Sequence, residues 1–173
     1  MKKILLVAIM IPLLFSCGKE ETPKSNSNII EYNEDSTSET NNSKPVETVD
    51  HIVIKANEDM TFDKVDFTVK TGQEITLLLV NNGTSPKEAM GHNVVVLNKD
   101  ADANSFAFAA SSASDNEYIP KDKEGDIIVH TKLLGPKESD QVKFTINEPG
   151  TYDFICSFPG HAATMKGKIK AIN

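Results

Sequence analysis

The chain has 173 residues, of which 25% are charged and 39% hydrophobic, and 18 basic against 25 acidic residues give a net charge of −7. This acidic balance argues against binding to nucleic acid, which requires a basic face. Two cysteines exclude a fold held by several disulfides, and four histidines leave room for one metal site at most. The length suits one folded domain with an appended segment.

Residues 1–16 are predicted to be a signal peptide. The chain begins with Met-Lys-Lys, continues through an apolar stretch at 4–15 and then reaches Ser16 and Cys17. A charged start, a short apolar stretch and a small residue before the cleavage point are typical of secretory signals. Because Leu-Phe-Ser-Cys at 14–17 resembles a bacterial lipobox, we expect Cys17 to carry a lipid anchor. An ordinary signal peptide that leaves a free cysteine is the alternative. The protein is then expected to be exported, to the periplasm or the outer membrane.

Residues 17–48 are predicted to form a flexible, acidic tether. Serine, threonine, asparagine and charged residues dominate here, and eight acidic side chains outnumber three lysines between Gly18 and Asp50. Such a composition buries too little apolar surface to offset the entropy lost on ordering. A flexible segment of this length would hold a domain on the order of 30 Å from a membrane. Its expected role is to hold the domain at a distance from the membrane, not to carry chemically active residues.

Residues 49–173 are predicted to form one all-β domain. Apolar and polar residues alternate over 65–70 and 142–147, which is the period-two pattern of half-buried strands. Further candidate strands, separated by glycine- and proline-containing turns, lie at 52–56, 75–80, 94–97, 127–131, 152–156 and 168–172. Seven or eight short strands at this spacing predict a two-sheet Greek-key β-sandwich. One short helical segment is expected within 101–115.

One ten-residue window gathers the side chains that bind soft metals. Cys156, His161 and Met165 place a thiol, an imidazole and a thioether in one loop, and the Pro159-Gly160 turn allows the chain to fold back. His92, just before a strongly apolar strand, is the best candidate for a second imidazole. Two histidines and a cysteine with a weak axial methionine are the ligands of an electron-transferring copper site.

Other readings of these residues remain open at this point. A single buried cysteine is usually an inert hydrophobic residue, and a methionine beside a strand is usually part of the core. Zinc accepts two histidines and one cysteine but prefers a harder fourth ligand or an additional thiolate over methionine. Cys156 and His161 would also suit a nucleophile and its base, although no Asn or Asp in the window would orient that base.

Three motifs resemble the cupredoxin family of blue-copper proteins, and its azurin-like members in particular. They are Met-Gly-His-Asn at 90–93, Val-His-Thr-Lys-Leu-Leu-Gly at 129–135 and Cys-Ser-Phe-Pro-Gly-His at 156–161, the last continuing through Met-Lys-Gly at 165–167. The resemblance extends from about residue 51 to the C-terminus. Four residues between Cys156 and His161, and three between His161 and Met165, match the azurin-like spacing.

The resemblance implies a set of ligands that surrounds one copper ion. This ion would cycle between Cu(I) and Cu(II). His92, Cys156 and His161 would be the three strong ligands, and Met165 would be a weak axial one. The backbone carbonyl of Gly91 would lie on the opposite side, because the absence of a Cβ allows a close approach.

The resemblance also implies roles for residues around the ligands. The Asn93 side chain would tie the two ligand-bearing loops together, and the backbone N–H of Phe158 would donate to the Cys156 sulfur. Electrons would pass through His161, the ligand expected nearest the surface. An apolar docking patch would surround it, formed by Met90, Pro159 and Ala162 with neighbouring apolar residues.

The expected function is therefore one-electron transfer rather than catalysis. Family analogy suggests c-type cytochromes, a peroxidase or reductases as partners, besides the membrane reached through Cys17. A copper chaperone or storage protein is the alternative, and a structural sandwich without metal is a third. His130 also matches a family position, away from the expected copper, and is expected to be a surface or structural residue.

Overall fold

The computed structural model describes residues 46–173. The predicted signal peptide, Cys17 and nearly all of the predicted tether lie outside the described residues. Among the helices of the described part, none has the length and apolar character needed to cross a bilayer.

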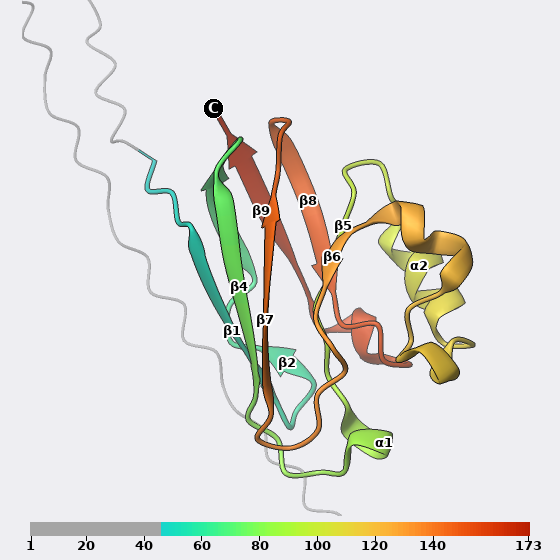
Figure 1. Cartoon of the computed structure of the whole chain (residues 1–173). Coiled ribbons are helices and arrows are strands. Elements are labelled where there is room, and N and C mark those ends of the chain that lie inside the picture. The colour runs from blue at the N-terminus through green and yellow to red at the C-terminus, as the bar shows by residue number, and fades with distance from the viewer. Residues whose placement is uncertain (1–45) are drawn as a thin grey trace, which may run out of the picture. The chain divides into compact units, whose positions relative to one another are not determined.

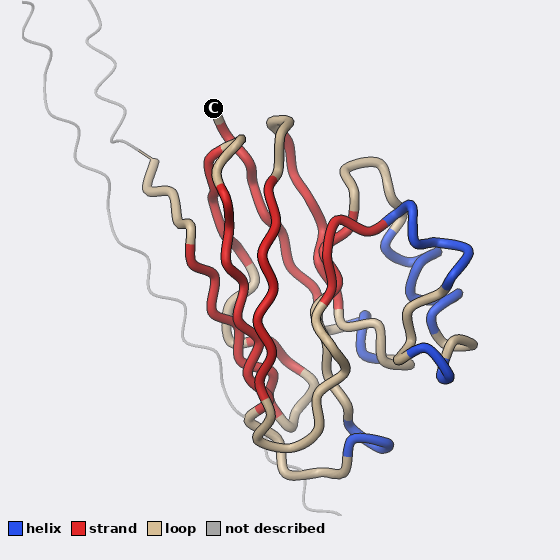
Figure 2. Tube along the Cα trace, viewed as in Figure 1, coloured by secondary structure: helices blue, strands red, loops and turns tan. Residues whose placement is uncertain are grey.

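Two β-sheets face each other in the described part of the chain (Figures 1 and 2). The smaller sheet has the order β2-β1-β4-β7 and the larger β3-β9-β8-β5-β6. Both are mixed, because β1 pairs with β4 in parallel and β3 pairs with β9 in parallel. The strands are β1 His51–Asn57, β2 Thr61–Phe62, β3 Asp66–Lys70, β4 Glu74–Asn81, β5 Val95–Leu97, β6 Ile127–His130, β7 Ser139–Thr145, β8 Gly150–Ile155 and β9 Lys166–Ile172.

The two-sheet β-sandwich predicted from the sequence is confirmed. Within residues 46–173 the chain has nine strands, one more than the seven or eight expected. The extra strand is β2, which pairs with the end of β1 through two residues, Phe62 opposite Ala56 and Thr61 opposite Asn57. Two residues are too short for an alternating pattern to appear in the sequence.

The main core lies between the two sheets and follows the alternation of the strands. In β1, Ile52, Ile54 and Ala56 are buried while the residues between them face outward. The larger sheet contributes Phe154, whose ring centroid lies 5.8 Å from that of Phe62. Full burial of such side chains stabilises the fold by about 1.5–3 kcal/mol each.

Helix α2, Ala103–Ala110, covers the outer face of the larger sheet, so that the molecule has three layers on this side (Figure 1). The Asp102 side chain caps its first turn by accepting a hydrogen bond from the Ser105 N–H at 2.5 Å. Phe106 and Ala110 pack against Val95, Leu97 and Ile155 of the sheet. The helix lies within the predicted segment 101–115. The remaining helical segments are α1, Lys87–Met90, and the 3-10 helices Ser114–Asn116, Lys121–Asp126 and His161–Ala163.

Strand β5 therefore lies in the middle layer and is covered on both sides. Val96 belongs to the core between the sheets, while Val95 and Leu97 belong to the cluster beneath α2. This double burial explains why the sequence is apolar at every position here instead of alternating. It also gives a rigid support to the residues that come just before the strand.

Candidate metal centre

Three residues from two distant segments of the sequence meet at one end of the sandwich. One ligand atom from each of His92, Cys156 and His161 lies within 4.8 Å of the others, and all three residues are buried. His92 precedes β5 and is held by a short bridge to Leu134, with backbone N–H to carbonyl distances of 3.1 and 2.8 Å. Cys156 directly follows the last residue of β8. Its sulfur lies 3.6 Å from Nδ1 of His161.

The loop from 156 to 165 is shaped by its own backbone hydrogen bonds. The Cys156 N–H donates to the Met165 carbonyl at 2.9 Å, which closes the loop where β8 ends and β9 begins. At Gly160 the chain turns with φ of 83°, a left-handed conformation that favours glycine. His161 follows at the start of a 3-10 helix, and its N–H donates to the Phe158 carbonyl at 3.0 Å. The Pro-Gly turn thus returns His161 toward Cys156, as the sequence predicts.

Two further predicted residues lie at the same end of the fold. The Met165 side chain is fully buried and belongs to the same core cluster as Cys156. Gly91 has an extended backbone with φ of −70°, so its conformation does not require glycine. Space does require it: a Cβ would lie 2.7 Å from the Lys87 carbonyl oxygen and 3.0 Å from Cγ of Leu133. A side chain at position 91 would therefore push apart α1 and the loop that carries Leu133.

Burial sets the protonation states of the cluster in the metal-free protein. It lowers the pKa of His161 to about 4, with a smaller contribution from nearby His92, and it also lowers the pKa of His92. It raises the pKa of Cys156 to about 11, although hydrogen bonds from the backbone of Asn93 and Phe158 act in the opposite direction. At neutral pH the site thus presents two neutral imidazoles and a protonated thiol. These shifts are opposite to those of an activated thiol nucleophile with a protonated base.

His92 shows that the cluster has unused binding capacity. Within the described part of the chain, neither ring nitrogen of His92 has a hydrogen-bond partner, and both are buried. An unsatisfied buried polar atom costs about 1–3 kcal/mol, so it calls for an explanation. A metal ion coordinated by one of these nitrogens accounts for that nitrogen. Two imidazoles, a thiolate and a thioether are soft donors that suit copper in both of its oxidation states.

Asn93 connects the two ligand-bearing segments through its side chain. Its Nδ2 donates to Oγ of Ser157 at 2.8 Å, and its Oδ1 accepts from the Ser157 N–H at 2.8 Å. Sequence reasoning identified Asn93 but missed Ser157 and the backbone N–H of Asn93, which donates toward the cysteine sulfur. A serine beside a ligand has no distinctive signal in one sequence, because its role depends on which buried group faces it.

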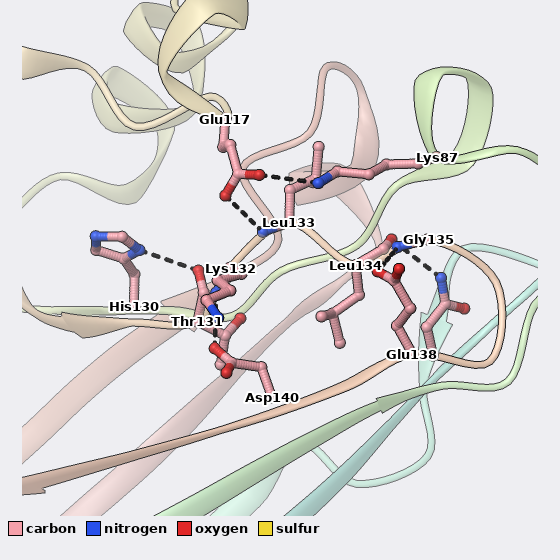
Figure 3. A network of polar contacts seen from close by, with 11 residues as sticks. Lys87, Glu117, His130, Thr131, Lys132, Leu133, Leu134, Gly135, Glu138 and Asp140 are labelled. Carbon is pink, nitrogen blue, oxygen red and sulfur yellow. Dashed lines mark hydrogen bonds and ion pairs between the residues drawn. The ribbon is translucent and has the colours of Figure 1, made fainter.

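A network of polar contacts holds the loop that pairs with His92 (Figure 3). The Glu117 carboxylate accepts from Nζ of Lys87 at 2.8 Å and from the Leu133 N–H at 3.1 Å, and the bond from Lys87 lowers the pKa of Glu117. Asn81 donates to the Leu134 carbonyl at 3.2 Å. The network therefore connects α1 and Glu117 to the segment on which His92 rests.

His130 lies apart from the cluster. Its ring is exposed, and Nδ1 lies 3.0 Å from the Thr131 carbonyl (Figure 3). It is not among the residues that gather around Cys156. This position agrees with the expected surface or structural role.

The residues predicted to form a docking patch differ in exposure. Pro159 is exposed, whereas Met90 and Ala162 are half-buried. Phe158 is buried, and its ring lies 4.6 Å from that of His161, so it forms a wall of the site. His161 retains 2% exposure, compared with 0% for His92. Of the two histidines, His161 is therefore the nearer to solvent.

Comparison with known proteins identifies the class to which this site belongs. Residues 49–171 match the family described as copper binding proteins, plastocyanin/azurin family. Azurin-1 of Alcaligenes xylosoxydans xylosoxydans is 39% identical over 125 residues, which are 69% of this chain and 95% of that protein. Outer membrane protein H.8 of Neisseria gonorrhoeae is 34% identical over 123 residues, 69% of this chain and 66% of that protein. The chain therefore belongs to the plastocyanin/azurin family of copper-binding proteins.

Solved structures agree with this assignment. Reduced auracyanin from Roseiflexus castenholzii superposes with a TM-score of 0.66 at 35% identity. The match covers 73% of this chain and 100% of that one. Auracyanin A of Chloroflexus aurantiacus, described as a "blue" copper protein, gives a TM-score of 0.63 at 34% identity and covers 70% of this chain and 98% of that one. The cofactor is therefore copper, and the function is copper-dependent electron transfer.

The matched region makes up 94–95% of several azurins, which consist of little else. A protein containing residues 46–173 is therefore expected to fold without the preceding segment.

Proposed function

We propose that this protein is a one-electron carrier with a single blue-copper centre. In this proposal His92, Cys156 and His161 are the three strong ligands, and Met165 and the carbonyl of Gly91 are weaker ones. The convergence of three buried donor residues, with both nitrogens of His92 unpaired in the described residues, is the observation that carries it. Bound copper supplies the one-electron redox chemistry, and the protein supplies its ligands and their surroundings.

The chain contributes rigidity and exclusion of water. His92 is fixed by its bridge to Leu134, Cys156 by its backbone bond to Met165, and the two segments by the Asn93–Ser157 pair. Donors that move little between oxidation states keep the reorganisation energy low. Because the donors are buried, a substrate molecule has no direct access to them, which favours a carrier over an enzyme. His161 is the proposed route for electrons to and from the surface.

Burial also bears on the alternative of a copper chaperone or storage protein. A delivery protein must release its ion to a partner, which is easier from exposed ligands. Here Cys156 and Met165 are 0% exposed and both lie in the main core cluster. Release would require the loop 156–165 to separate from the sandwich. The carrier therefore fits the structure better.

The proposed setting is the bacterial cell envelope. Residues 1–16 would be removed, Cys17 would carry the lipid, and residues 17–48 would tether the copper domain at 49–173. The similarity to a protein named outer membrane protein H.8 supports this arrangement. The proposed partners are redox proteins such as c-type cytochromes, a peroxidase or reductases. Replacement of Cys17 by serine should shift the protein from the membrane fraction to the soluble fraction, and retention in the membrane would contradict the anchor.

The absorption and EPR spectra of residues 46–173 after addition of Cu²⁺ test the electron-carrier proposal. An intense blue band with narrow copper hyperfine splitting, lost on reduction and restored on oxidation, is expected. C156S should lose the blue band, because the band requires the thiolate, while H130A should keep it as the control histidine. Copper binding without this band in the unmodified domain would contradict the proposal and favour copper storage or delivery.

A further inference from the structure

The turn between β1 and β2 carries a carboxylate that is held in one position by several hydrogen bonds. Glu58 lies in this turn, and its Oε2 accepts from the Thr84 N–H at 2.6 Å and from the Ser85 N–H at 3.4 Å. Its Oε1 accepts from the Ser85 hydroxyl. These bonds, the one from the Ser85 hydroxyl above all, lower the pKa of Glu58. The carboxylate is therefore ionised at neutral pH and fixed in place.

The same turn contacts both segments that carry the proposed ligands. Residues 84–85, to which Glu58 is bonded, begin the segment that leads through α1 to His92. On the other side, the Thr164 hydroxyl of the ligand loop donates to the Met60 carbonyl at 2.7 Å. The turn is thus attached to the end of the sandwich where the cluster lies, although Glu58 is not one of the clustered donors.

The charge of Glu58 is not neutralised by a neighbouring cation. Within residues 46–173 no lysine forms an ion pair with it, whereas Glu117 is paired with Lys87 at 2.8 Å. The charge also reaches the cluster: burial lowers the pKa of His92, and Glu58 acts in the opposite direction. A carboxylate that favours positive charge at His92 also favours a metal ion of higher charge beside it.

The charge of the site depends on the oxidation state of the copper. In the metal-free protein at neutral pH, both imidazoles are neutral and the Cys156 thiol is protonated. Binding of Cu²⁺ with release of the thiol proton leaves the site with one positive charge, whereas binding of Cu⁺ with the same release leaves it neutral. A fixed negative charge nearby therefore stabilises the oxidised site and has little effect on the reduced one.

We propose that Glu58 lowers the reduction potential of the copper centre through its fixed and unpaired negative charge. This inference rests on the proposed electron-carrier function. Reduction adds one electron and no proton, because the thiolate stays bound, so Cu(II) becomes Cu(I) and the site loses its positive charge. The attraction to Glu58 is lost in the same step. The hydrogen bonds from residues 84–85 keep the carboxylate in the same place in both oxidation states.

The variant E58Q tests this inference, because glutamine keeps the size of the side chain and removes its charge. Its Oε1 can accept from the Thr84 N–H while its Nε2 donates to Oγ of Ser85. The affinity for Cu²⁺ relative to Cu⁺ should fall about threefold, a size typical of interactions with an exposed charge. The potential should then rise by about 28 mV, at 59 mV for each tenfold change. Protein-film voltammetry measures this shift, which should shrink in about 1 M salt.

The matched control is E74Q, which removes the same charge at the opposite end of the smaller sheet. Glu74 begins β4, and Asn81 ends it beside the loop that pairs with His92, roughly 24 Å away along the strand. Its potential should equal that of the unmodified domain. An equal shift in E58Q and E74Q would overturn the inference, because it would reflect net charge and not the position of Glu58.

A second readout needs no copper and no redox change. Zn²⁺ and Ag⁺ carry the charges of the two copper states, so E58Q should bind Zn²⁺ about threefold more weakly and Ag⁺ equally well in chelator competition. Equal potentials and equal Zn²⁺ affinities for E58Q and the unmodified domain would overturn the inference. So would weaker binding of both ions or loss of the blue band in E58Q, which would assign Glu58 a purely structural role. An unmodified domain without a blue band would instead contradict the electron-carrier function, and the Zn²⁺ and Ag⁺ affinities would still decide the role of Glu58.

Discussion

Asn93 and Ser157 bind each other through two hydrogen bonds of 2.8 Å in opposite directions, and both residues are buried. Each lies next to a proposed ligand, Asn93 after His92 and Ser157 after Cys156. The pair therefore sets the separation of the two ligand-bearing segments. It does so with protein atoms alone, so the site keeps its shape without metal.

Replacement of Asn93 by alanine removes both bonds and leaves the Ser157 N–H without its partner. A loss of about 2–4 kcal/mol in the free energy of unfolding is expected, since unsatisfied buried groups cost about 1–3 kcal/mol each. Chemical denaturation of the metal-free domain measures this value. S157A is the matched control, because it removes only the bond to Oγ and keeps the one to Oδ1 of Asn93. Equal losses for the two variants would show that the backbone bond contributes nothing.

Met165 is expected to affect the reduction potential of the copper more than the affinity of the protein for copper. In M165L the weak thioether donor is lost while an apolar side chain of similar size remains. The oxidised ion then loses more stabilisation than the reduced ion, and the potential should rise on the order of 60 mV, which corresponds to a tenfold change for one electron. Protein-film voltammetry measures the shift. A potential that stays the same would mean that the Met165 sulfur does not interact with copper.

Copper binding should release one proton from the protein at neutral pH. The pKa of Cys156 is about 11, so the thiol must ionise, whereas the imidazole of His161, with a pKa of about 4, is already neutral. The apparent affinity should fall about tenfold for each pH unit between about 9 and 5, and more steeply near pH 4. Calorimetry of copper binding in buffers of different ionisation enthalpy counts the protons. A release of two protons would mean that one histidine is charged in the metal-free protein.

The metal-free domain should lose stability as the pH falls from about 6.5 toward 4. The pKa values of His92 and His161 are depressed in the folded protein, so the unfolded chain binds more protons in this range. The penalty is absent above the unfolded pKa and grows until His161 is protonated in the folded state as well. Thermal unfolding across this pH range checks the trend. A stability that stays the same between pH 6.5 and 4 would contradict the depressed pKa values of the two buried histidines.

Gly167 cannot accept a side chain. A Cβ at this position would lie 2.3 Å from Cζ of Phe154 and 2.3 Å from the Val65 carbonyl oxygen. G167A is therefore expected to destabilise the domain by about 3 kcal/mol or more, because β9 or the Phe154 ring must move. G125A is the control, since nothing lies within 4 Å of its Cβ. A stable G167A protein would show that Phe154 can rotate away at little cost.

The β-sandwich and most of the ligand cluster could be predicted because both leave regular patterns in the sequence. Period-two alternation identifies strands such as β1 and β4. The spacing from Cys156 to Met165 places three candidate metal ligands in one loop. The face that α2 buries could not be predicted in the same way. Phe106 and Phe108 are two residues apart and point in different directions on a helix, and only the packed sheet decides that Phe106 is buried. The Ser157 contact depends on a residue 64 positions away, which no local pattern encodes.

The long sequence separation between Asn93 and Ser157 also bears on the order of events during maturation. The segment with His92 and the segment with Cys156 meet only after β5 and β8 have paired, so the donor cluster is completed late in folding. In an unfolded chain Cys156, His161 and Met165 are close in sequence, but His92 is not held beside them. We therefore expect copper to bind the folded domain, and a chain exported in the unfolded state would take up its copper after export.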